Sequence, residues 1–396
     1  MGDLGERPIR VLAADDSAVM RGIMRHLFLR HGGNPKGEQP RMELCGVARD
    51  GVECLEAVQQ LKPDVLVLDL EMPRLNGLEV LERLRRQSPG LPVIMCSSHT
   101  EHGARSTLEA LARGASDYVM KPVEQKDFVS ALLSLAQQLL PRVVALAKGT
   151  RKQGTGKSGQ LRSGVARMSA DATIELVVIG LSTGGPSALE QMLPKLPADF
   201  PVPVMIVQHM PKLFTGPLAE RLNKCCSLQV EQAYDGAVIR PGTVWLAPGD
   251  SHMEVADGVL GIGEEARRRG RVKLHQREML NHCRPSVDHL FFSAARMYGA
   301  GTLALMMTGM GSDGLDGARA VHERGGVVLA QDEATSAVWG MPGRVTEAGI
   351  ASATLPLNAL ADELMQRTYA GRVTRMPVQH HAAISIARRE VIHGLL

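Results

Sequence analysis

The sequence is poor in features that mark several large classes of protein. Aromatic residues make up only 3% of its 396 residues, so platforms on which nucleic-acid bases could stack are scarce. Its six cysteines show no CxxC or Cys/His ligand spacing, which indicates a reducing compartment. No run approaches 18 uninterrupted apolar residues, and the N-terminal stretch MGDLGERPIR lacks an apolar signal core. We therefore expect a cytoplasmic protein that inserts into no membrane.

The bulk composition is that of a soluble globular protein, with 44% hydrophobic and 22% charged residues. The net charge of +3 argues neither for nor against a nucleic-acid partner. A chain of 396 residues is too long for one ordinary core, so two or three domains are expected.

The first part of the chain, residues 9–140, alternates strand-like and helix-like segments. Short apolar strands with helical crossovers predict a doubly wound parallel sheet that is covered on both faces. An amphipathic stretch at 18–30 is one such helix, and 31-HGGNPKGEQPR-41 is interpreted as an inserted loop. The strand candidates are 9-IRVLAA-14, 42-MELCGVA-48, 64-DVLVLDL-70, 92-PVIMCSS-98 and 117-DYVM-120.

The rest of the chain contains a basic stretch, a second α/β pattern and a tail. Residues 148–169 have six Lys/Arg, five Gly and no acid, which is typical of a flexible tether or of a weak docking site for anions. The charge run 264-EEARRRGRVK-273 is predicted to be a solvated loop. The second strand candidates lie near 174–180, 203–208, 243–247, 302–307 and 326–330. The predicted boundaries are 9–140, a linker over 141–171, a second domain over 172–367 and a tail over 368–396.

Polar side chains of the first domain fall at strand ends. The carboxyl ends of parallel strands lie on one edge of a sheet, where ligands bind. Asp15 and Asp16 follow the first strand, Asp69 ends the third, Ser97 ends the fourth, and Lys121 follows the fifth. Clustered carboxylates need a cation to offset their repulsion, and ligands that are all oxygen favour Mg²⁺.

The stretches VLAADDSAVMR, VLVLDLEMPRLNGLEVL and DYVMKP resemble the receiver domain of two-component response regulators. The resemblance implies a flavodoxin-like fold and phosphorylation of Asp69 by a histidine kinase. It further implies Mg²⁺ bound by Asp16, Asp69 and the backbone carbonyl of Glu71. Asp15 would support these ligands without binding the ion directly. Two residues, Lys121 and Ser97, would bind the phosphoryl oxygens. The ring of Tyr118 would swing inward on activation.

The stretch 178-VIGLSTGGPSALE-190 places a serine on a glycine-flanked corner at the end of a buried strand. Such a corner could cradle a phosphate or present a nucleophile. The pattern Gly-Leu-Ser182-Thr-Gly matches a nucleophile elbow, whereas G-x-G-x-x-G and Gly-Lys-Ser/Thr are both missing here.

A nucleophilic serine needs a base and a group that orients the base. His209 directly follows the next strand, and Asp313 follows the strand at 302–307, so both are expected on the same sheet edge as Ser182. Three such residues at strand ends of one sheet favour a catalytic triad. His252 and His282 have no serine corner beside them, and structural roles are predicted for both.

The stretches GLSTGGPSAL, VQHMP, WLAPGDSHM, CRPSVDHLF, TGMGSDG and VWGMPG resemble the catalytic domain of chemotaxis protein-glutamate methylesterases. The resemblance implies a Rossmann-like serine-hydrolase domain that acts on methylated chemoreceptors, fed by a histidine kinase of the chemotaxis type. It adds deamidation of receptor glutamines. Backbone N–H groups of Met310 and Thr183 are candidates for stabilising the oxyanion, and ester hydrolysis would need no cofactor.

Two rival hypotheses remain. A DNA-binding output would need a basic helix-turn-helix near the C-terminus, but 172–366 is interpreted as a second α/β sheet, so we expect no nucleic-acid partner. A receiver-bearing scaffold that binds receptors without turnover is disfavoured by the combination of Ser182, His209 and Asp313.

Overall fold

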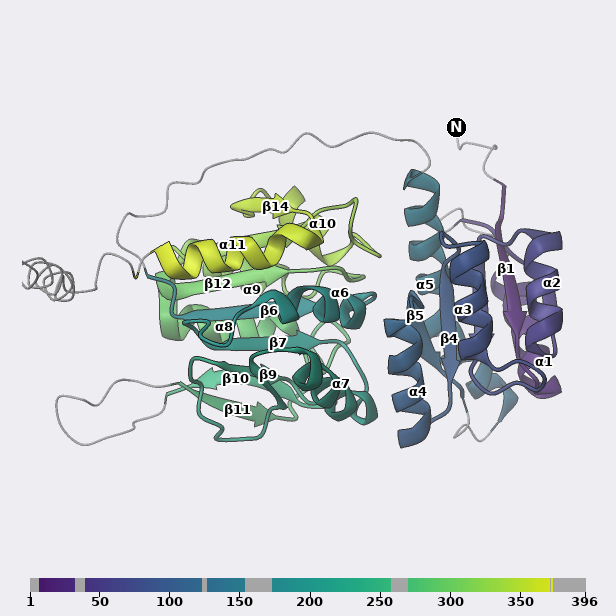
Figure 1. The fold of residues 1–396 in the computed structure, drawn as a ribbon, viewed down its shortest axis with the longest axis horizontal. Coiled ribbons are helices and arrows are strands. Elements are labelled where there is room, and N and C mark those ends of the chain that lie inside the picture. Colours follow the sequence, from purple (N-terminus) through teal and green to yellow (C-terminus); the bar gives the residue numbers. More distant parts are fainter. Residues whose placement is uncertain are drawn as a thin grey trace, which may run out of the picture.

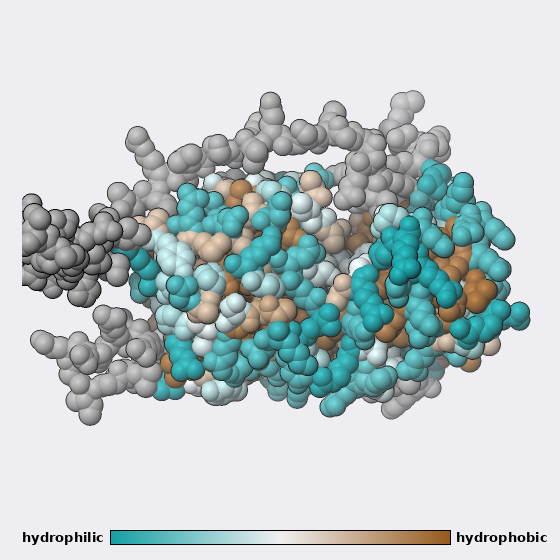
Figure 2. Space-filling view, viewed as in Figure 1, coloured by the Kyte–Doolittle hydropathy of each residue, from teal (hydrophilic) through white to brown (hydrophobic). Residues whose placement is uncertain are grey.

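The computed structural model describes residues 7–32, 40–122, 127–153, 173–257, 270–370 and 372. The described chain forms two α/β units that lie side by side (Figure 1). The prediction of two doubly wound parallel-sheet domains is confirmed by the order and direction of their strands. Most of the face shown in Figure 2 is hydrophilic, with smaller apolar areas between.

The N-terminal unit is a five-stranded sheet in the order β2-β1-β3-β4-β5, with every neighbouring pair parallel. This is the flavodoxin-like order, in which the chain changes direction between β1 and β3 and opens a crevice at their carboxyl ends. The strands are β1 (Ile9–Ala14), β2 (Met42–Ala48), β3 (Val65–Asp69), β4 (Val93–Ser97) and β5 (Asp117–Met120). The helices are α1 (Ala18–His31), α2 (Gly51–Leu61), α3 (Gly77–Gln87), α4 (Glu101–Ala112) and α5 (Phe128–Gln153).

The C-terminal unit is a seven-stranded parallel sheet in the order β14-β13-β12-β6-β7-β9-β8. Its direction reverses between β6 and β12, so a second crevice is expected there. The strands are β6 (Leu176–Leu181), β7 (Val204–Gln208), β8 (Gln229–Gln232), β9 (Thr243–Leu246), β12 (Thr302–Met306), β13 (Val327–Gln331) and β14 (Ala353–Leu355). The α-helices are α6 (Gly185–Met192), α7 (Lys212–Cys225), α8 (Val287–Tyr298), α9 (Leu315–Glu323), α10 (Met341–Glu347) and α11 (Leu357–Ala370). Two short 3₁₀ turns are η1 (Leu193–Lys195) and η2 (Gly299–Gly301).

A separate antiparallel hairpin of β10 (His252–Ala256) and β11 (Arg271–His275) packs against α8. The prediction of a solvated loop over 264–273 is therefore wrong for Arg271–Lys273, which belong to β11. The reason is local alternation, since Val272 is buried while Lys273 on the other face is exposed. Residues 264–269 lie outside the described residues.

Helix α5 extends further than the sequence indicated. The linker was predicted from residue 141, but α5 is helical through Gln153, because the apolar residues that pack it continue to Val143, Leu146 and Ala147. The described residues contain one helix apolar and long enough to cross a membrane, Phe128–Gly149, which belongs to α5. Its buried residues belong to the core of the first unit, which accounts for that composition.

Some boundaries stay predictions. Residues 154–172, 33–39 and 373–396 lie outside the described residues, and with them most of the predicted linker, inserted loop and tail. Helix α11 continues past the predicted boundary at residue 367, to Ala370.

The two units share an interface formed by the α4–β5–α5 side of the first unit and by α6 and α7 of the second (Figure 1). The ring of Tyr118 in β5 stacks on Phe214 in α7, with ring centroids 4.6 Å apart and both residues buried. Ser187 in α6 donates a hydrogen bond to the carbonyl of Leu111 at 2.9 Å. An exposed ion pair between Arg105 and Glu220 closes the rim at 2.9 Å.

Candidate functional site

The crevice between β1 and β3 gathers two buried carboxylates around a lysine. Lys121 Nζ lies 2.7 Å from Asp69 Oδ2 and 3.1 Å from Asp15 Oδ2. Both aspartates are only 2% exposed, and Lys121 is the one partner that either Oδ2 atom has among the described residues. Asp69 therefore keeps an oxygen that is held by charge but is not saturated by donors.

The pKa values of these groups reflect their burial and the closeness of their charges. Burial, reinforced by the charge of Asp15, raises the pKa of Asp69 to about 6, against the opposing effect of Lys121. Burial also raises the pKa of Asp15. Burial would lower the pKa of Lys121, but its hydrogen bond to Asp69 and the charges of both aspartates outweigh burial and raise it. The single positive charge of Lys121 does not completely offset the negative charges of Asp15 and Asp69, whereas a bound cation would supply the missing positive charge.

The donor set at this edge fits Mg²⁺. Carboxylate oxygens of Asp15, Asp16 and Asp69 lie within 4.8 Å of one another. Asp16 is exposed whereas the other two are buried, so a cation would be reached from solvent on one side. Hard oxygen ligands with room for water suit Mg²⁺. Glu71 follows the end of β3, and its N–H donates to Asp69 Oδ1 at 3.4 Å.

The other two residues predicted to sense a phosphoryl group lie at the same end of the sheet. Ser97 is fully buried and accepts a hydrogen bond from Thr107 Oγ1 at 2.7 Å, which ties the end of β4 to α4. Its own hydroxyl donates to the carbonyl of Gly103 at 3.3 Å. The ring of Tyr118, in contrast, lies in the interface against Phe214. Ser97 and Tyr118 thus connect the Asp69 edge to the two elements, α4 and β5, that face the second unit.

The serine corner lies at the second crevice. Strand β6 ends at Leu181, and Gly184 then takes a left-handed φ of 77° that turns the chain into α6. The hydrogen bond from Ser182 N–H to the carbonyl of Thr308, 3.0 Å, joins the corner to the loop after β12. A Cβ at Gly309 would lie 2.9 Å from Ser182 Cβ, so only glycine allows this loop to approach so closely. The serine is partly exposed.

His209 and Asp313 form a direct pair, with His209 Nε2 2.7 Å from Asp313 Oδ2. Asp313 is 3% exposed, and both oxygens of its carboxylate accept hydrogen bonds. Its further donors are Val287 N–H at 2.6 Å, Ser286 Oγ at 2.7 Å and Asn281 Nδ2 at 3.0 Å. A carboxylate with four donors is fixed in orientation and stays ionised.

The pKa values of the pair move in opposite directions. Burial opposes ionisation of His209, but its hydrogen bonds with the acceptor Asp313 and with Cys283 outweigh burial and raise the pKa of His209. Burial likewise opposes ionisation of Asp313, but the bond to His209 and the bonds from Ser286 and Asn281 outweigh it and lower the pKa of Asp313. The geometry therefore favours an imidazolium beside a carboxylate.

Ser182 and His209 stand at adjacent strand ends, β6 and β7, but no hydrogen bond joins their side chains in the described structure. With Nε2 held by Asp313, the free nitrogen of His209 is Nδ1, and it lies 3.6 Å from Cys283 Sγ. Gln208 Nε2 donates to the carbonyls of Ser182 and His209 at 2.9 and 3.1 Å, which couples the two corners through their backbones.

Both predicted oxyanion donors lie at this site. The backbone N–H groups of Thr183 and Met310 have no acceptor within the described parts of the chain. The hydroxyl of Thr183 donates to Asp117 Oδ2 in β5 at 2.8 Å, so the residue after the serine contacts the first unit. The side chain of Met310 packs against the hydrophobic cluster that contains α5. The first unit therefore covers this corner.

Several residues of the site escaped the sequence analysis. Asn281, Cys283 and Ser286 lie in the stretch 281-NHCRPSVD-288 directly before α8, and their signal was a polar cluster beside Asp288. Asp117 was treated as the first residue of a strand, although it accepts from both Thr183 and Arg142. Of the two histidines given structural roles, His252 is fully buried and accepts from Ser286 N–H at 3.2 Å, whereas His282 is exposed.

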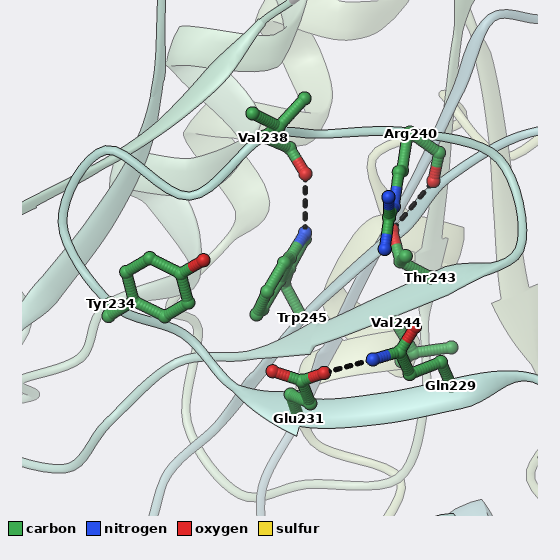
Figure 3. Close-up of a pocket in the computed structure, with 8 residues that line it drawn as sticks. All are labelled: Gln229, Glu231, Tyr234, Val238, Arg240, Thr243, Val244 and Trp245. Carbon is green, nitrogen blue, oxygen red and sulfur yellow. Dashed lines mark hydrogen bonds between the residues drawn. The ribbon is translucent and has the colours of Figure 1, made fainter.

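A pocket of about 180 Å³ lies at the other edge of the second sheet and contains none of the predicted site residues (Figure 3). The Trp245 indole donates to the Val238 carbonyl at 3.2 Å across it. Its lining residues are Gln229, Glu231, Tyr234, Val238, Arg240, Thr243, Val244 and Trp245.

Comparison with known proteins matches both units. A profile of the CheB methylesterase family matches residues 177–364, and a profile of the response regulator receiver domain matches residues 11–133. A protein-glutamate methylesterase/protein-glutamine glutaminase of Trichodesmium erythraeum is 41% identical over 90% of this chain and 98% of its own length. The protein of that name from Thermotoga maritima is 39% identical over 91% of this chain and 99% of its own.

Two solved structures are also similar. The crystal structure of the Thermotoga maritima CheB methylesterase catalytic domain covers 49% of this chain and 99% of its own, with 39% identity and a TM-score of 0.46. That of the response regulator domain of Thermotoga maritima CheB covers 38% of this chain and 100% of its own, with 38% identity and a TM-score of 0.29. The alignment with each of the two sequence relatives covers nearly the full length of this chain and of the relative. This chain therefore belongs to the CheB methylesterase family and carries a receiver domain ahead of its catalytic domain.

Proposed function

We propose that this protein hydrolyses methyl esters of glutamate side chains on chemoreceptors and deamidates receptor glutamines, and that phosphorylation of its receiver domain activates it. The observation that carries the proposal is the His209–Asp313 pair at 2.7 Å, set on the same sheet edge as the Ser182 corner. The relatives that share this chain's length are named for these two activities. The protein would act in the cytoplasm, on the cytoplasmic parts of its receptors.

The chemistry is acyl transfer through the serine. Ser182 Oγ attacks the γ-carbonyl carbon while His209 Nδ1 takes its proton, and Asp313 holds the imidazolium that forms. The N–H groups of Thr183 and Met310 stabilise the oxyanion. The intermediate collapses as His209 returns the proton to the leaving methoxide, which departs as methanol, or to the leaving amine, which departs as ammonia. Water then hydrolyses the acyl-enzyme by the same steps.

The arrangement described here is suited to a resting state. The free nitrogen of His209 faces Cys283, so the imidazole must turn from Cys283 to Ser182 before the serine is activated. The receiver at the same time holds Thr183 through Asp117, and Met310 packs against the hydrophobic cluster that α5 forms with Val338. The receiver therefore adjoins both predicted oxyanion donors, and the domain acts as a lid.

Phosphorylation would release the lid through α4 and β5. A histidine kinase of the chemotaxis type would transfer a phosphoryl group to Asp69, with Mg²⁺ held by Asp16, Asp69 and the Glu71 carbonyl and with Asp15 supporting the site. Lys121 and Ser97 would then bind the phosphoryl oxygens. Because Ser97 is tied to α4 through Thr107, its movement would shift α4 and free Tyr118 from Phe214. Weakening that contact by a few kcal/mol is enough to shift a two-state equilibrium.

The direct test is methanol release from methylated receptor membranes, with and without a small-molecule phosphodonor and Mg²⁺. Ser182→Ala should lose activity by about 10⁴–10⁶-fold in kcat, because it removes the nucleophile while alanine fits the corner. Asp69→Asn should keep basal activity and lose the stimulation by phosphodonor. A Ser182→Ala enzyme with more than a tenth of the wild-type rate would contradict the serine mechanism.

A further inference from the structure

A second cluster of ionisable side chains lies away from the serine corner, on the β10–β11 hairpin and α8. His252 faces His275 across the two strands, and Glu254 lies two residues further along β10. Side chains two apart in a strand share a face, so Glu254 and His275 are diagonal neighbours on one face of the hairpin. His289, in the first turn of α8, meets them from the helix that packs on this face.

The three side chains converge on one point. Glu254 Oε1 lies 3.0 Å from His275 Nε2 and 2.9 Å from His289 Nδ1. The ligand atoms all lie within 4.8 Å of one another. The side chains are 19%, 14% and 19% exposed respectively, so the group is enclosed but reachable from solvent.

We propose that Glu254, His275 and His289 form a binding site for a divalent transition metal, and that Zn²⁺ is the ion that fits it best. Two imidazoles and one carboxylate are a recurrent ligand set for zinc, with bonds of roughly 2.0–2.2 Å. Tetrahedral bonds of that length separate ligand atoms by about 3.3 Å, and the two distances from Glu254 Oε1 to the ring nitrogens, 3.0 and 2.9 Å, are a few tenths of an ångström shorter than this. Nitrogen ligands disfavour Mg²⁺ and Ca²⁺.

Binding would require both imidazoles to change tautomer. The hydrogens that His275 Nε2 and His289 Nδ1 now share with Glu254 would move to the other ring nitrogens, and the lone pairs so exposed would bind the ion. Water would complete the coordination, since three protein ligands leave one tetrahedral position open.

The neighbouring His252 supports the site without binding the metal. Its ring centroid is 4.1 Å from that of His289, but both of its nitrogens are engaged. Nδ1 accepts from Ser286 N–H at 3.2 Å, and Nε2 donates to the Glu278 carbonyl at 3.1 Å.

A metal here would brace the loop that orients Asp313. The ion would fasten α8 to the hairpin, and α8 begins directly after Ser286, whose hydroxyl donates to Asp313 and whose N–H donates to His252. The site would therefore be a structural clamp behind the catalytic pair. It would bind metal whether or not Ser182 turns over esters.

The test uses full-length protein, stripped with chelator and dialysed, and titrated with Zn²⁺ by calorimetry in excess Mg²⁺ to fill the receiver site. One equivalent of Zn²⁺ per chain is expected. Co²⁺ serves as a spectroscopic probe, because His209, Cys283 and Asp313 also lie within 4.8 Å of one another and could compete for metal. Visible bands of cobalt bound by nitrogen and oxygen are expected, without the near-ultraviolet band of a cobalt–thiolate bond.

Two ligand variants locate the ion. His289→Ala and Glu254→Gln should each weaken Zn²⁺ binding by at least about 100-fold, since even outer partners of a metal ligand contribute 10–100-fold. The control, His322→Asn, changes an exposed histidine of α9 and should bind as wild type. Circular dichroism checks folding, and Glu254→Gln preserves side-chain shape if His289→Ala proves unstable. Absence of a stoichiometric site, binding unchanged in both variants, or a cobalt–thiolate band would each overturn the proposal.

Discussion

The two sheet edges that carry the predicted functional residues share a topology and differ in the surroundings of a buried aspartate. Asp69 and Asp313 both lie at the reversal point of a doubly wound sheet, and both are almost fully buried. Asp313 accepts four hydrogen bonds, and its pKa is lowered despite its burial. Asp69 has Lys121 and one long bond from Glu71, and its pKa is raised to about 6.

The difference separates an orienting carboxylate from a reacting one. A carboxylate whose lone pairs are all occupied can hold a partner in place but has no oxygen free to form a bond. One that is buried with an unsaturated oxygen is held at a higher free energy and can accept a metal and a phosphoryl group. Position on the sheet predicts that a residue is functional, whereas the number of donors around it predicts the role.

The largest effect should come from a substitution of Asp313, the aspartate whose carboxylate accepts four hydrogen bonds. Asp313→Asn should lower kcat by about 10³–10⁴-fold, because a neutral amide neither fixes the required tautomer of the neutral imidazole nor stabilises the imidazolium that forms from it. Combining it with Ser182→Ala should add little, since members of a triad act as a unit. The measurement is single-turnover methanol release for the single and double variants. Losses that multiply in the double variant would show that the two residues act separately.

Sequence alone predicted the edge residues because strand ends can be recognised from apolar runs. Asp69 ends such a run in the first sheet. Ser182, His209 and Asp313 each follow one in the second sheet, where parallel pairing brings these three to one edge. The partners of Asp313 could not be found this way. They come from the loop before α8, which has no hydrophobic period to place it, and their contacts depend on tertiary packing.

The same limit explains the elements that were missed. Strand β8, with the sequence QVEQ, lies at a sheet edge and is largely polar, and β14 spans only Ala353–Leu355. Neither presents the apolar run of a central strand. The contact between Asp117 and Thr183 joins two domains, so no local pattern in either one could indicate it.

The next largest effect concerns the hydrogen bond between Thr183 and Asp117, which connects the two domains. Asp117→Ala removes the acceptor of Thr183 Oγ1 and leaves Arg142 without its partner, which weakens the closed state. Basal methanol release without phosphodonor should rise by about 10-fold or more, as expected when a minor open state is 0.1–10% populated. Arg105→Ala is the matched control, because its exposed interdomain pair contributes little. An unchanged basal rate in Asp117→Ala would contradict the lid.

The incomplete hydrogen bonding of Asp69 should affect the free energy of unfolding. Ionised Asp69 is penalised in the folded state, so Asp69→Asn should raise the free energy of unfolding at pH 7.5 by up to about 3 kcal/mol, since the pKa rises from 3.8 to about 6 and each pKa unit corresponds to roughly 1.4 kcal/mol. The gain should vanish near pH 4, where the folded-state carboxyl of the wild type is protonated. Urea unfolding at the two pH values measures it, and Mg²⁺ should narrow the gap by stabilising the wild type. A destabilised Asp69→Asn protein at pH 7.5 would show that Asp69 is saturated after all.

The smallest effect tests whether Cys283 influences the pKa of His209, the predicted catalytic base. His209 can act as a base only when it is deprotonated, so its raised pKa means that activity rises with pH through that pKa. The contact of Cys283 with Nδ1 contributes to the rise. Cys283→Ala should therefore move the acid limb of the pH profile of kcat/KM to lower pH and raise activity at neutral pH by less than about tenfold. Cys283→Ser keeps a polar group at that position and should shift the limb less. An acid limb that does not move in Cys283→Ala would mean that Asp313 alone sets the pKa of His209, and that the 3.6 Å contact has no part in holding the resting state.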